Sequence, residues 1–553
     1  MKKALVCLMM ILPGIMLAQV TEEWVARYFS GFTETWKEAV AIVVDDEGNV
    51  YVTGHCPRLD TVNDTIEQNI DIVTVKYNSQ GDEQWVQSYN GPGDDTDWPF
   101  AMAIDSSGNV YVTGYSVGSE TGTDYITIKY SSGGEEEWVA RYDGPISGSD
   151  FAWDLAIDTE SNVYVTGSSE GEGSEGDCVT IRYNSTGKEV WVERYNGTRD
   201  GFDVGTSIET DHAGNVYVAG EVSNLETWSD FLIIKYSSMG YEKWTASYDG
   251  PANHYDHVTD LAWDGSGNVY VTGVSASASD PINKDYATCK FSASGQMRWA
   301  ARYDGPSGTE DEPVTIVVND WGSVYVTGHS YKDKNDWDFL TIKYSSIGEE
   351  QWVKRYEGDA GVWDEAHDMA MDHQGNIYVT GYSFNDETSI DCTTIKYSPE
   401  GEELWIADYN GSEYGIDKGN AIVLDKLGNV YVSGGCTNYP EETMNYLTIK
   451  YSQGPGVAEA YPDLPGHRLE VAQLTPEPVI TYTLPSSSSI SLKVYDVTGK
   501  LVRTLVSGSQ EAGTHTVTWD GRDNVGQQVS SGLYFIRIAA PGFSRFAKVV
   551  MIR

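Results

Sequence analysis

Short runs of alternating apolar and polar residues, separated by turn residues, fill the chain from about residue 22 to residue 452. The segment Val-Tyr-Val-Thr-Gly is the clearest of these runs. Alternation with a period of two predicts β-strands, and the Asp, Asn, Gly and Ser clusters between runs predict hairpin turns. No long stretch repeats apolar residues every 3.6 positions, so helices are not expected. The pattern predicts an all-β protein.

This segment recurs eight times, and the glycine that ends it marks each copy. The glycines are Gly54, Gly114, Gly167, Gly220, Gly273, Gly328, Gly381 and Gly434. One copy contains four predicted strands, at 101–105, 110–114, 124–130 and 138–142. Four strands in roughly 50 residues make one blade of a β-propeller. Each copy except the last also has one tryptophan in its fourth strand, which predicts a repeated packing position between blades.

The two ends of the repeat region complement each other. The last copy has a third strand at 445–451 but no tryptophan strand after it, whereas the chain start has a tryptophan strand at 22–28 with nothing before it. We expect residues 22–28 to complete the last blade, because a closed ring leaves no open sheet edge. Residues 19–454 are therefore predicted to form an eight-bladed β-propeller whose N-terminal strand closes the last blade. Seven blades plus a stray repeat is the alternative.

A different β pattern begins at Val479, after a segment at 455–478 that is rich in proline and is predicted to be a linker. Residues 479–553 hold eight Lys and Arg against four Asp and Glu, whereas the whole chain has a net charge of -47. This contrast in charge predicts a separate, small C-terminal β domain.

Both parts resemble known families. The repeats resemble the bacterial β-propeller repeat of the SBBP type, with the signature D-x-x-G-N-V-Y-V-T-G, T-I-K-Y and G-x-x-x-W over roughly residues 21–454. This resemblance implies a propeller and an extracytoplasmic setting, and it implies no activity.

The tail resembles the Ig-like sandwich of hook-capping proteins and of type IX secretion sorting domains, through Val494-Tyr495-Asp496, Trp519-Asp520-Gly521 and Leu533-Tyr534. It implies an Ig-like β-sandwich at 479–553 that engages the secretion machinery and serves export or surface attachment. Sorting domains usually begin with an Asn-Pro segment, which Leu474 to Pro478 replaces here. An Ig-like spacer without a sorting role is the alternative.

The N-terminus and the overall charge bear on where the protein acts. Residues 1–18 have two lysines, an apolar stretch and a small residue at Ala18, which predicts a secretory signal peptide. No other stretch reaches the roughly 20 apolar residues of a membrane helix, so no membrane span is expected. Acidic residues number 83 and basic residues 36, which argues against nucleic-acid binding. We expect a secreted or surface-attached protein.

Variable segments on a rigid scaffold are the usual place for binding. The longest connection between a second and a third strand runs from His55 to Ile70, so His55, Arg58, Asp60 and Asp64 are predicted to lie on the ligand face. Cys56 and Cys436 would lie on neighbouring blades, where buried free thiols are favoured over a disulfide.

Seven copies also carry an aspartate eight residues before the first turn. These residues are Asp97, Asp150, Asp203, Asp256, Asp311, Asp364 and Asp417, with Lys37 at the position in the first copy. Carboxylates are the ligands that Ca²⁺ prefers, so this ring is a candidate metal site. Local hydrogen bonds to the backbone are the favoured role, as in Asx turns. No other cofactor is expected.

The catalytic motifs G-x-S-x-G, H-E-x-x-H and the P-loop are absent from the sequence. We therefore predict a non-enzymatic binding scaffold for a glycan or a protein. An extracellular hydrolase or lyase that uses carboxylates is the first alternative, and a structural surface or matrix component is the second.

Overall fold

A computed structural model describes residues 20–29, 36–62, 65–276, 284–306, 308, 310–333, 336–358, 360–411, 415–438, 443–453, 468–471, 478–484, 487–495, 501–524, 526–530, 532–540 and 543–551. The predicted signal peptide lies outside these residues. The chain divides into two compact units, Met1–Gly454 and Pro455–Arg553. The described residues are strands and connections without a helix, and none of them could cross a membrane as a helix.

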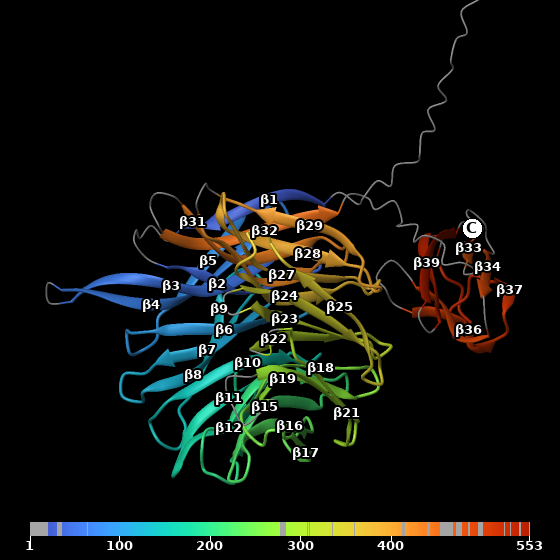
Figure 1. Cartoon of the computed structure of the whole chain (residues 1–553). Helices are drawn as coiled ribbons and strands as arrows, with labels where there is room; N and C mark the ends of the chain where they lie inside the picture. The colour runs from blue at the N-terminus through green and yellow to red at the C-terminus, as the bar shows by residue number, and fades with distance from the viewer. Residues whose placement is uncertain are drawn as a thin grey trace, which may run out of the picture. The chain divides into compact units, whose positions relative to one another are not determined.

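The described part of the first unit forms eight antiparallel four-stranded sheets, a propeller-like fold (Figure 1). Sheet 1 is β2 (Glu38–Val44), β3 (Val50–Val62), β4 (Thr65–Tyr77) and β5 (Glu83–Tyr89); sheet 2 is β6 (Asp97–Ile104), β7 (Val110–Val117), β8 (Thr123–Tyr130) and β9 (Glu136–Tyr142); sheet 3 is β10 (Asp150–Ile157), β11 (Val163–Gly171), β12 (Ser174–Tyr183) and β13 (Glu189–Tyr195); sheet 4 is β14 (Val204–Thr210), β15 (Val216–Asn224), β16 (Trp228–Tyr236) and β17 (Glu242–Tyr248). Sheet 5 is β18 (Asp256–Trp263), β19 (Val269–Ala276), β20 (Lys284–Phe291) and β21 (Met297–Tyr303); sheet 6 is β22 (Asp311–Val318), β23 (Val324–Asp333), β24 (Asp336–Tyr344) and β25 (Glu350–Tyr356); sheet 7 is β26 (Asp364–Met371), β27 (Ile377–Asn385), β28 (Ser389–Tyr397) and β29 (Glu403–Tyr409); sheet 8 is β30 (Asp417–Leu424), β31 (Val430–Asn438), β32 (Thr443–Gln453) and β1 (Val20–Tyr28).

The turn between the first and second strands is built by its aspartate. In sheet 2, one carboxylate oxygen of Asp105 accepts hydrogen bonds from the N–H groups of Ser107 and Asn109, and the other accepts from the Tyr111 hydroxyl at 2.9 Å. Gly108 supplies the positive φ of 77° that the turn requires. The recurring Asp-x-x-Gly-Asn sequence is therefore turn chemistry.

Tryptophan and glycine join each sheet to the next. The indole N–H of Trp85 in sheet 1 donates to the Ser132 carbonyl of sheet 2 at 3.2 Å. The ring lies against Gly134, where an added Cβ would come within 2.7 Å of the indole Cγ. The glycine of the Gly-x-x-x-Trp motif thus receives the tryptophan of the preceding sheet. Equivalent pairs recur along the unit.

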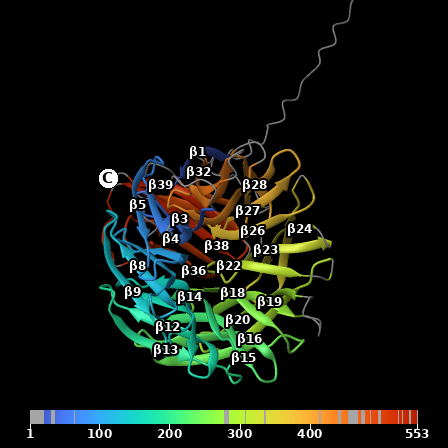
Figure 2. The same cartoon turned by 90° about the vertical axis from the view of Figure 1, so that its left-hand side faces the viewer.

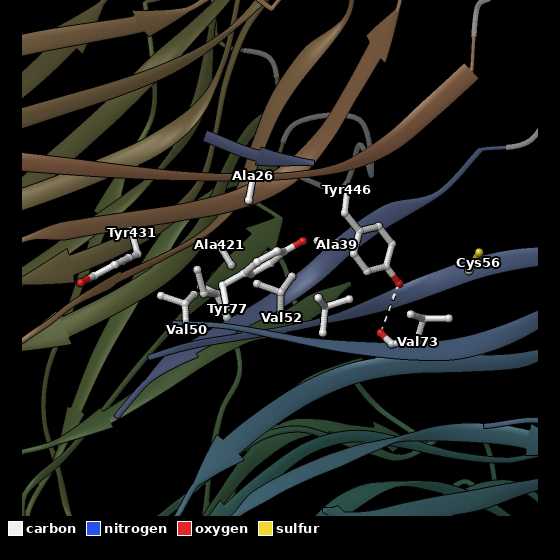
Figure 3. Close-up of a cluster of buried hydrophobic side chains, with 12 residues drawn as sticks. Ala26, Ala39, Val50, Val52, Cys56, Val73, Tyr77, Ala421, Tyr431 and Tyr446 are labelled. Carbon is white, nitrogen blue, oxygen red and sulfur yellow. Dashed lines mark hydrogen bonds between the residues drawn. The ribbon is translucent and has the colours of Figure 1, made fainter. Parts of the chain in front are cut away.

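The first and last sheets make the same contact. β1 pairs antiparallel with β32 in sheet 8, and its Trp24 donates to the Ser79 carbonyl of sheet 1 at 3.1 Å. Gly81 receives this indole ring as Gly134 receives Trp85. Figure 3 shows the buried cluster at this junction, where the Tyr446 hydroxyl donates to the Val73 carbonyl at 3.3 Å. Residues about 370 positions apart in sequence therefore share one core.

Two predictions from the sequence concern sheet 1, one for its longest connection and one for its cysteine. The connection expected as a loop at His55–Ile70 is instead an extension of β3 and β4, which pair from Val50–Tyr77 to Val62–Thr65. The prediction of a loop was wrong because polar residues in this hairpin hid its strand character. Cys56 and Cys436 are both buried and form no disulfide, as is true of the other described cysteines.

The described part of the second unit holds a three-stranded and a four-stranded sheet. The three-stranded sheet is β33 (Arg468–Val471), β34 (Val479–Leu484) and β37 (Gly513–Thr518); the four-stranded sheet is β36 (Leu501–Gln510), β35 (Ser488–Tyr495), β38 (Gly532–Ala540) and β39 (Phe543–Met551). Trp519 is fully buried in the core between them and packs edge-on against Tyr534. β33 lies inside the segment predicted as linker, so this part of the linker prediction was wrong. Four residues among prolines are too few to show a period.

Candidate functional site

The first strands of neighbouring sheets lie side by side. The carboxylate of Asp154 on β10 accepts hydrogen bonds from the N–H of Leu155 and, at 2.9 Å, from the N–H of Ile208 on β14. Asp260 and Asp368 make the same pair of contacts from sheets 5 and 7 to the next sheet. In Figure 2, β18 and β22 lie nearer than β20 and β24 to the centre around which the sheets are arranged. The first strands therefore line the inner side.

These inner carboxylates share one environment. Burial between the strands raises the pKa of Asp154 to about 7, although the hydrogen bonds from the two N–H groups act in the opposite direction. The pKa of Asp368 is likewise raised to about 7 by burial. The charge of Asp260, two sheets away from each, contributes to both shifts.

The seven ring aspartates stand where the first strands begin and are at most 1% exposed. In each, one carboxylate oxygen accepts from the N–H of the glycine six residues earlier, at 2.5–2.8 Å. Burial raises the pKa of Asp97, Asp203, Asp256, Asp311 and Asp417 to about 6. The carboxylates that act on Asp150 are Asp143 and Asp124, not other members of the ring. The ring is thus a set of separate sites at the junctions between sheets.

The residues predicted for the ligand face have internal contacts. His55 is 8% exposed and stacks on Trp98 with ring centroids 3.8 Å apart. Burial lowers the pKa of His55 to about 4. Arg58 forms ion pairs with Asp71 and Asp94, which ties the hairpin to the connection after sheet 1. Asp64 lies outside the described residues, and the side chain of Asp60 in β3 is not among those described.

An aromatic cluster occupies the start of β6 and β10, and sequence reasoning missed it. It comprises Trp98, Phe100, Tyr115, Phe151 and Trp153. The rings of Phe100 and Trp153 are 4.3 Å apart, and Tyr115 meets Phe151 edge-on at 5.2 Å. Trp153 is 37% exposed and the others are half-buried. At the first-strand positions of this cluster, the other sheets carry Glu, His, Lys, Asn, Thr or Val.

Acidic and polar side chains occupy the same positions in sheets 7, 8 and 1. His367 lies 3.1 Å from Asn420, whose amide donates to Glu38 at 2.8 Å. The other ring nitrogen of His367 lies 3.4 Å from Glu365. Although burial acts in the opposite direction, hydrogen bonds from His367 and Tyr382 lower the pKa of Glu365 to about 2.

The polar group and the aromatic cluster meet at sheet 1. Glu38 pairs across the strands with His55, which stacks on Trp98 of the cluster. The contacts therefore run without a break from β26 through β30 and β2 to β6 and β10. We use the name first-strand arc for Glu365, His367, Asn420, Glu38, His55 and the aromatic cluster together. Its signal in the sequence is the second and fourth positions of the first strand, where the repeat varies most.

The side of the molecule that carries the arc is the one on which first and third strands begin. Asp97 at the start of β6 lies opposite Ser116 at the end of β7, and β8 begins directly beyond it. Trp36 and Trp363 stand just before first strands, Trp228 begins a third strand, and all three are 48–57% exposed. These exposed aromatic residues therefore lie on the side where first and third strands begin.

Two parts of the chain match known families. Residues 84–119 match the β-propeller repeat SBBP, and residues 470–542 match the FlgD Ig-like domain. An uncharacterized WD repeat-containing protein of Acanthamoeba polyphaga mimivirus is 23% identical over 372 residues, which are 56% of this chain and 26% of that protein. The basal-body rod modification protein FlgD of Salmonella typhimurium is 33% identical over 84 residues, 14% of this chain and 36% of that protein. The chain thus spans about a quarter to a third of these relatives.

Solved structures show weaker likeness. PorZ, a bacterial surface component of the type IX secretion system of Porphyromonas gingivalis, is 14% identical, with 93% of this chain and 75% of that chain covered and a TM-score of 0.31. Drosophila Plexin A in complex with Semaphorin 1b is 10% identical, with 78% and 87% covered and a TM-score of 0.36. Taken together, the sequence matches establish that this chain contains a β-propeller repeat at 84–119 and a FlgD Ig-like domain at 470–542.

Proposed function

We propose that this protein is a secreted or surface-displayed scaffold, in which eight sheets form the blades of a closed β-propeller and the first-strand arc binds a glycan. The observation that carries the proposal is the break in the repeat: at the variable positions of the inner strands, some sheets have aromatic rings and others have carboxylates. Closure is supported by the contacts of β1 and Trp24 with sheet 1.

The chemistry of the arc favours a sugar. A pyranose has an apolar C–H face that stacks on an exposed indole and hydroxyls that hydrogen-bond to carboxylates and amides. The arc offers Trp153 for stacking, and Glu365, Glu38 and Asn420 for hydrogen bonds. Aromatic walls with a few placed polar groups are typical of ligand sites.

Binding of the full mature chain to a printed glycan array tests this proposal. Trp153→Ala should lower the affinity for the most tightly bound glycan by roughly tenfold, because a stacking aromatic is a typical hot spot. Trp321→Ala is the matched control, since Trp321 is also exposed but stands in the turn between β22 and β23. Equal affinities in the two variants, or no binding to any glycan, would refute the role of the arc.

Export through the C-terminal domain is the second part of the proposal. It is supported by the signal-like residues 1–18 and by the FlgD Ig-like match at 470–542. Deleting residues 479–553 in the organism that makes the protein should leave the propeller inside the cell envelope, as measured by fractionation. Unchanged appearance of the truncated chain in the medium or on the surface would contradict a sorting role.

A further inference from the structure

Three junctions between sheets bring three aspartates together. The triads are Asp124–Asp143–Asp150, Asp230–Asp249–Asp256 and Asp285–Asp304–Asp311, and in each one oxygen per residue lies within 4.8 Å of the others. Each triad takes one residue from a third strand, one from the connection and one ring aspartate. Oxygens that share a calcium ion at 2.3–2.6 Å are separated by no more than about 5 Å, so all three have suitable spacing.

Two of the triads contain an arginine partner. Arg141 donates to Asp124 at 2.6 Å, and Arg302 donates to Asp285 at 2.8 Å. Both arginines occupy the sixth position of the fourth strand. The guanidinium neutralises one carboxylate of its triad and occupies the space beside it.

The triad between sheets 4 and 5 lacks this arginine. Ser247 stands at the position of Arg141 and Arg302. In the described part of the chain, no Lys or Arg forms an ion pair with Asp230, Asp249 or Asp256. Arg302 belongs to the next triad, where it donates to Asp285, and it also donates to the carbonyl of Ser275, which lies opposite Asp256. No described cation thus forms an ion pair with the three carboxylates at this junction.

Two carboxylates of this triad also have a buried oxygen that accepts no hydrogen bond, Oδ1 of Asp230 and Oδ1 of Asp256, and residues of the other two triads have such oxygens as well. Asp230 is 5% exposed, and its Oδ2 accepts from Asn224 at 2.8 Å and from Thr227 at 2.9 Å. Its Oδ1 is buried and accepts no hydrogen bond. A buried carboxylate oxygen without a donor is costly unless a cation or water satisfies it. Asp249 is exposed, so water can complete the coordination of an ion.

We infer that Asp230, Asp249 and Asp256 bind a calcium ion at the junction of sheets 4 and 5. The site is independent of the first-strand arc. Burial and the charge of Asp230 raise the pKa of Asp249, which agrees with an uncompensated cluster. With three protein carboxylates and the rest water, the affinity should resemble that of extracellular calcium modules, roughly 10⁻⁴–10⁻³ M in Kd.

Calcium chloride titrated into the metal-stripped full mature chain, followed by calorimetry and by sensitised terbium luminescence, tests the site. We expect one saturable site. Asp249→Asn should weaken it by roughly tenfold or more, because a charged ligand is lost from an exposed position that the fold does not need. Asp143→Asn, the matched change in a triad that has its arginine, should leave the affinity unchanged.

Exchange of the arginine provides the reciprocal test. Ser247→Arg should abolish binding, since the new guanidinium would pair with Asp230 as Arg141 pairs with Asp124. Arg141→Ser should create a second site of similar affinity at Asp124, Asp143 and Asp150. Absence of saturable binding in the parent chain, or binding that survives both Asp249→Asn and Ser247→Arg in chains with unchanged thermal midpoints without calcium, would overturn the inference.

Discussion

At the scale of single residues, the fold depends on positions where a side chain must be absent. In seven of the eight sheets, the indole ring of the tryptophan lies within 3.0 Å of the place that the Cβ of a turn glycine in the next sheet would take. Gly134 also has a φ of 88°, a conformation that other residues adopt only with strain. The Gly-x-x-x-Trp motif is therefore a contact between two sheets, not only a local turn.

Gly134→Ala should lower the free energy of unfolding by about 1–3 kcal/mol, because the methyl group would meet the Trp85 ring and the φ would be strained. Urea denaturation followed by tryptophan fluorescence measures the change. Gly133→Ala is the control, since its Cβ would meet only the Ser131 hydroxyl, at 3.7 Å. If both variants lose the same stability, the tryptophan contact is not the cause.

The inner carboxylates predict how stability depends on pH. The pKa values of Asp154 and Asp368 are raised to about 7 in the folded chain, against about 4 for an unfolded aspartate. A raised pKa means that the folded state binds more protons between these values. The stabilisation that this provides is complete below about pH 4 and is lost as the pH rises through about 7.

We therefore expect the thermal midpoint of the propeller to fall between pH 5 and pH 7.5 in scanning calorimetry. The double variant Asp154→Asn, Asp368→Asn should show a shallower decline, because asparagine stays neutral throughout. The slopes of the midpoint against pH are compared, and not the midpoints themselves, because each asparagine accepts one hydrogen bond fewer than the aspartate at every pH. Asp386→Asn, at an exposed turn, should keep the parent slope. A slope that the double variant shares with the parent would argue against these two groups.

At the scale of elements, the four strands of a sheet have different structural roles. The second and third strands supply most of the fully buried residues, and the fourth carries the tryptophan that docks on the next sheet. The first strand keeps only alternate positions for the core, so its remaining positions can vary without loss of packing. The first-strand arc arises on this strand for that reason.

β1 is the element that joins the last sheet to the first. Deleting residues 20–28 removes the contact of Trp24 with sheet 1 and exposes the edge of β32. Both changes should lower the thermal midpoint and promote aggregation. Light scattering and calorimetry measure both effects. A synthetic peptide of residues 20–28 should bind the truncated chain and restore its midpoint, whereas the same peptide with Trp24→Ala should not. A truncated chain as stable and monomeric as the parent would contradict this role for β1.

At the scale of the whole molecule, the two units have separate cores. The core of the second unit contains Trp519 and Tyr534, and no residue of the first unit belongs to it. Separate cores permit independent unfolding. The fully buried Trp519 is the only tryptophan after residue 454, so it reports on this unit alone when the unit is isolated.

Isolated residues 455–553 should therefore fold, emit blue-shifted tryptophan fluorescence and unfold in one cooperative transition on heating. The calorimetric transition of the full chain should contain this transition at the same midpoint. Trp519→Ala should destabilise the isolated unit by about 3–5 kcal/mol, as expected for a buried aromatic. Red-shifted emission without a transition would show that this unit needs the propeller.

The sequence by itself determined most of the strands, their number per repeat, the complementary ends and the presence of a second unit. These follow from the alternation of apolar residues and from turns such as Asp105–Asn109, which are interactions between near neighbours in the chain. The predicted loop at His55–Ile70 failed because the polar residues of this extended hairpin lack that alternation.

Only the tertiary structure decided which variable positions meet. Glu38, Asn420 and His367 form one network although 53 to 382 residues separate its members, and the aromatic cluster joins two sheets. Tertiary packing likewise divided the ring aspartates among separate junctions and placed Ser247 where sheets 2 and 5 have an arginine. Repetition makes every sheet alike in sequence, so differences acquire chemical meaning only when the fold brings distant residues within contact of each other.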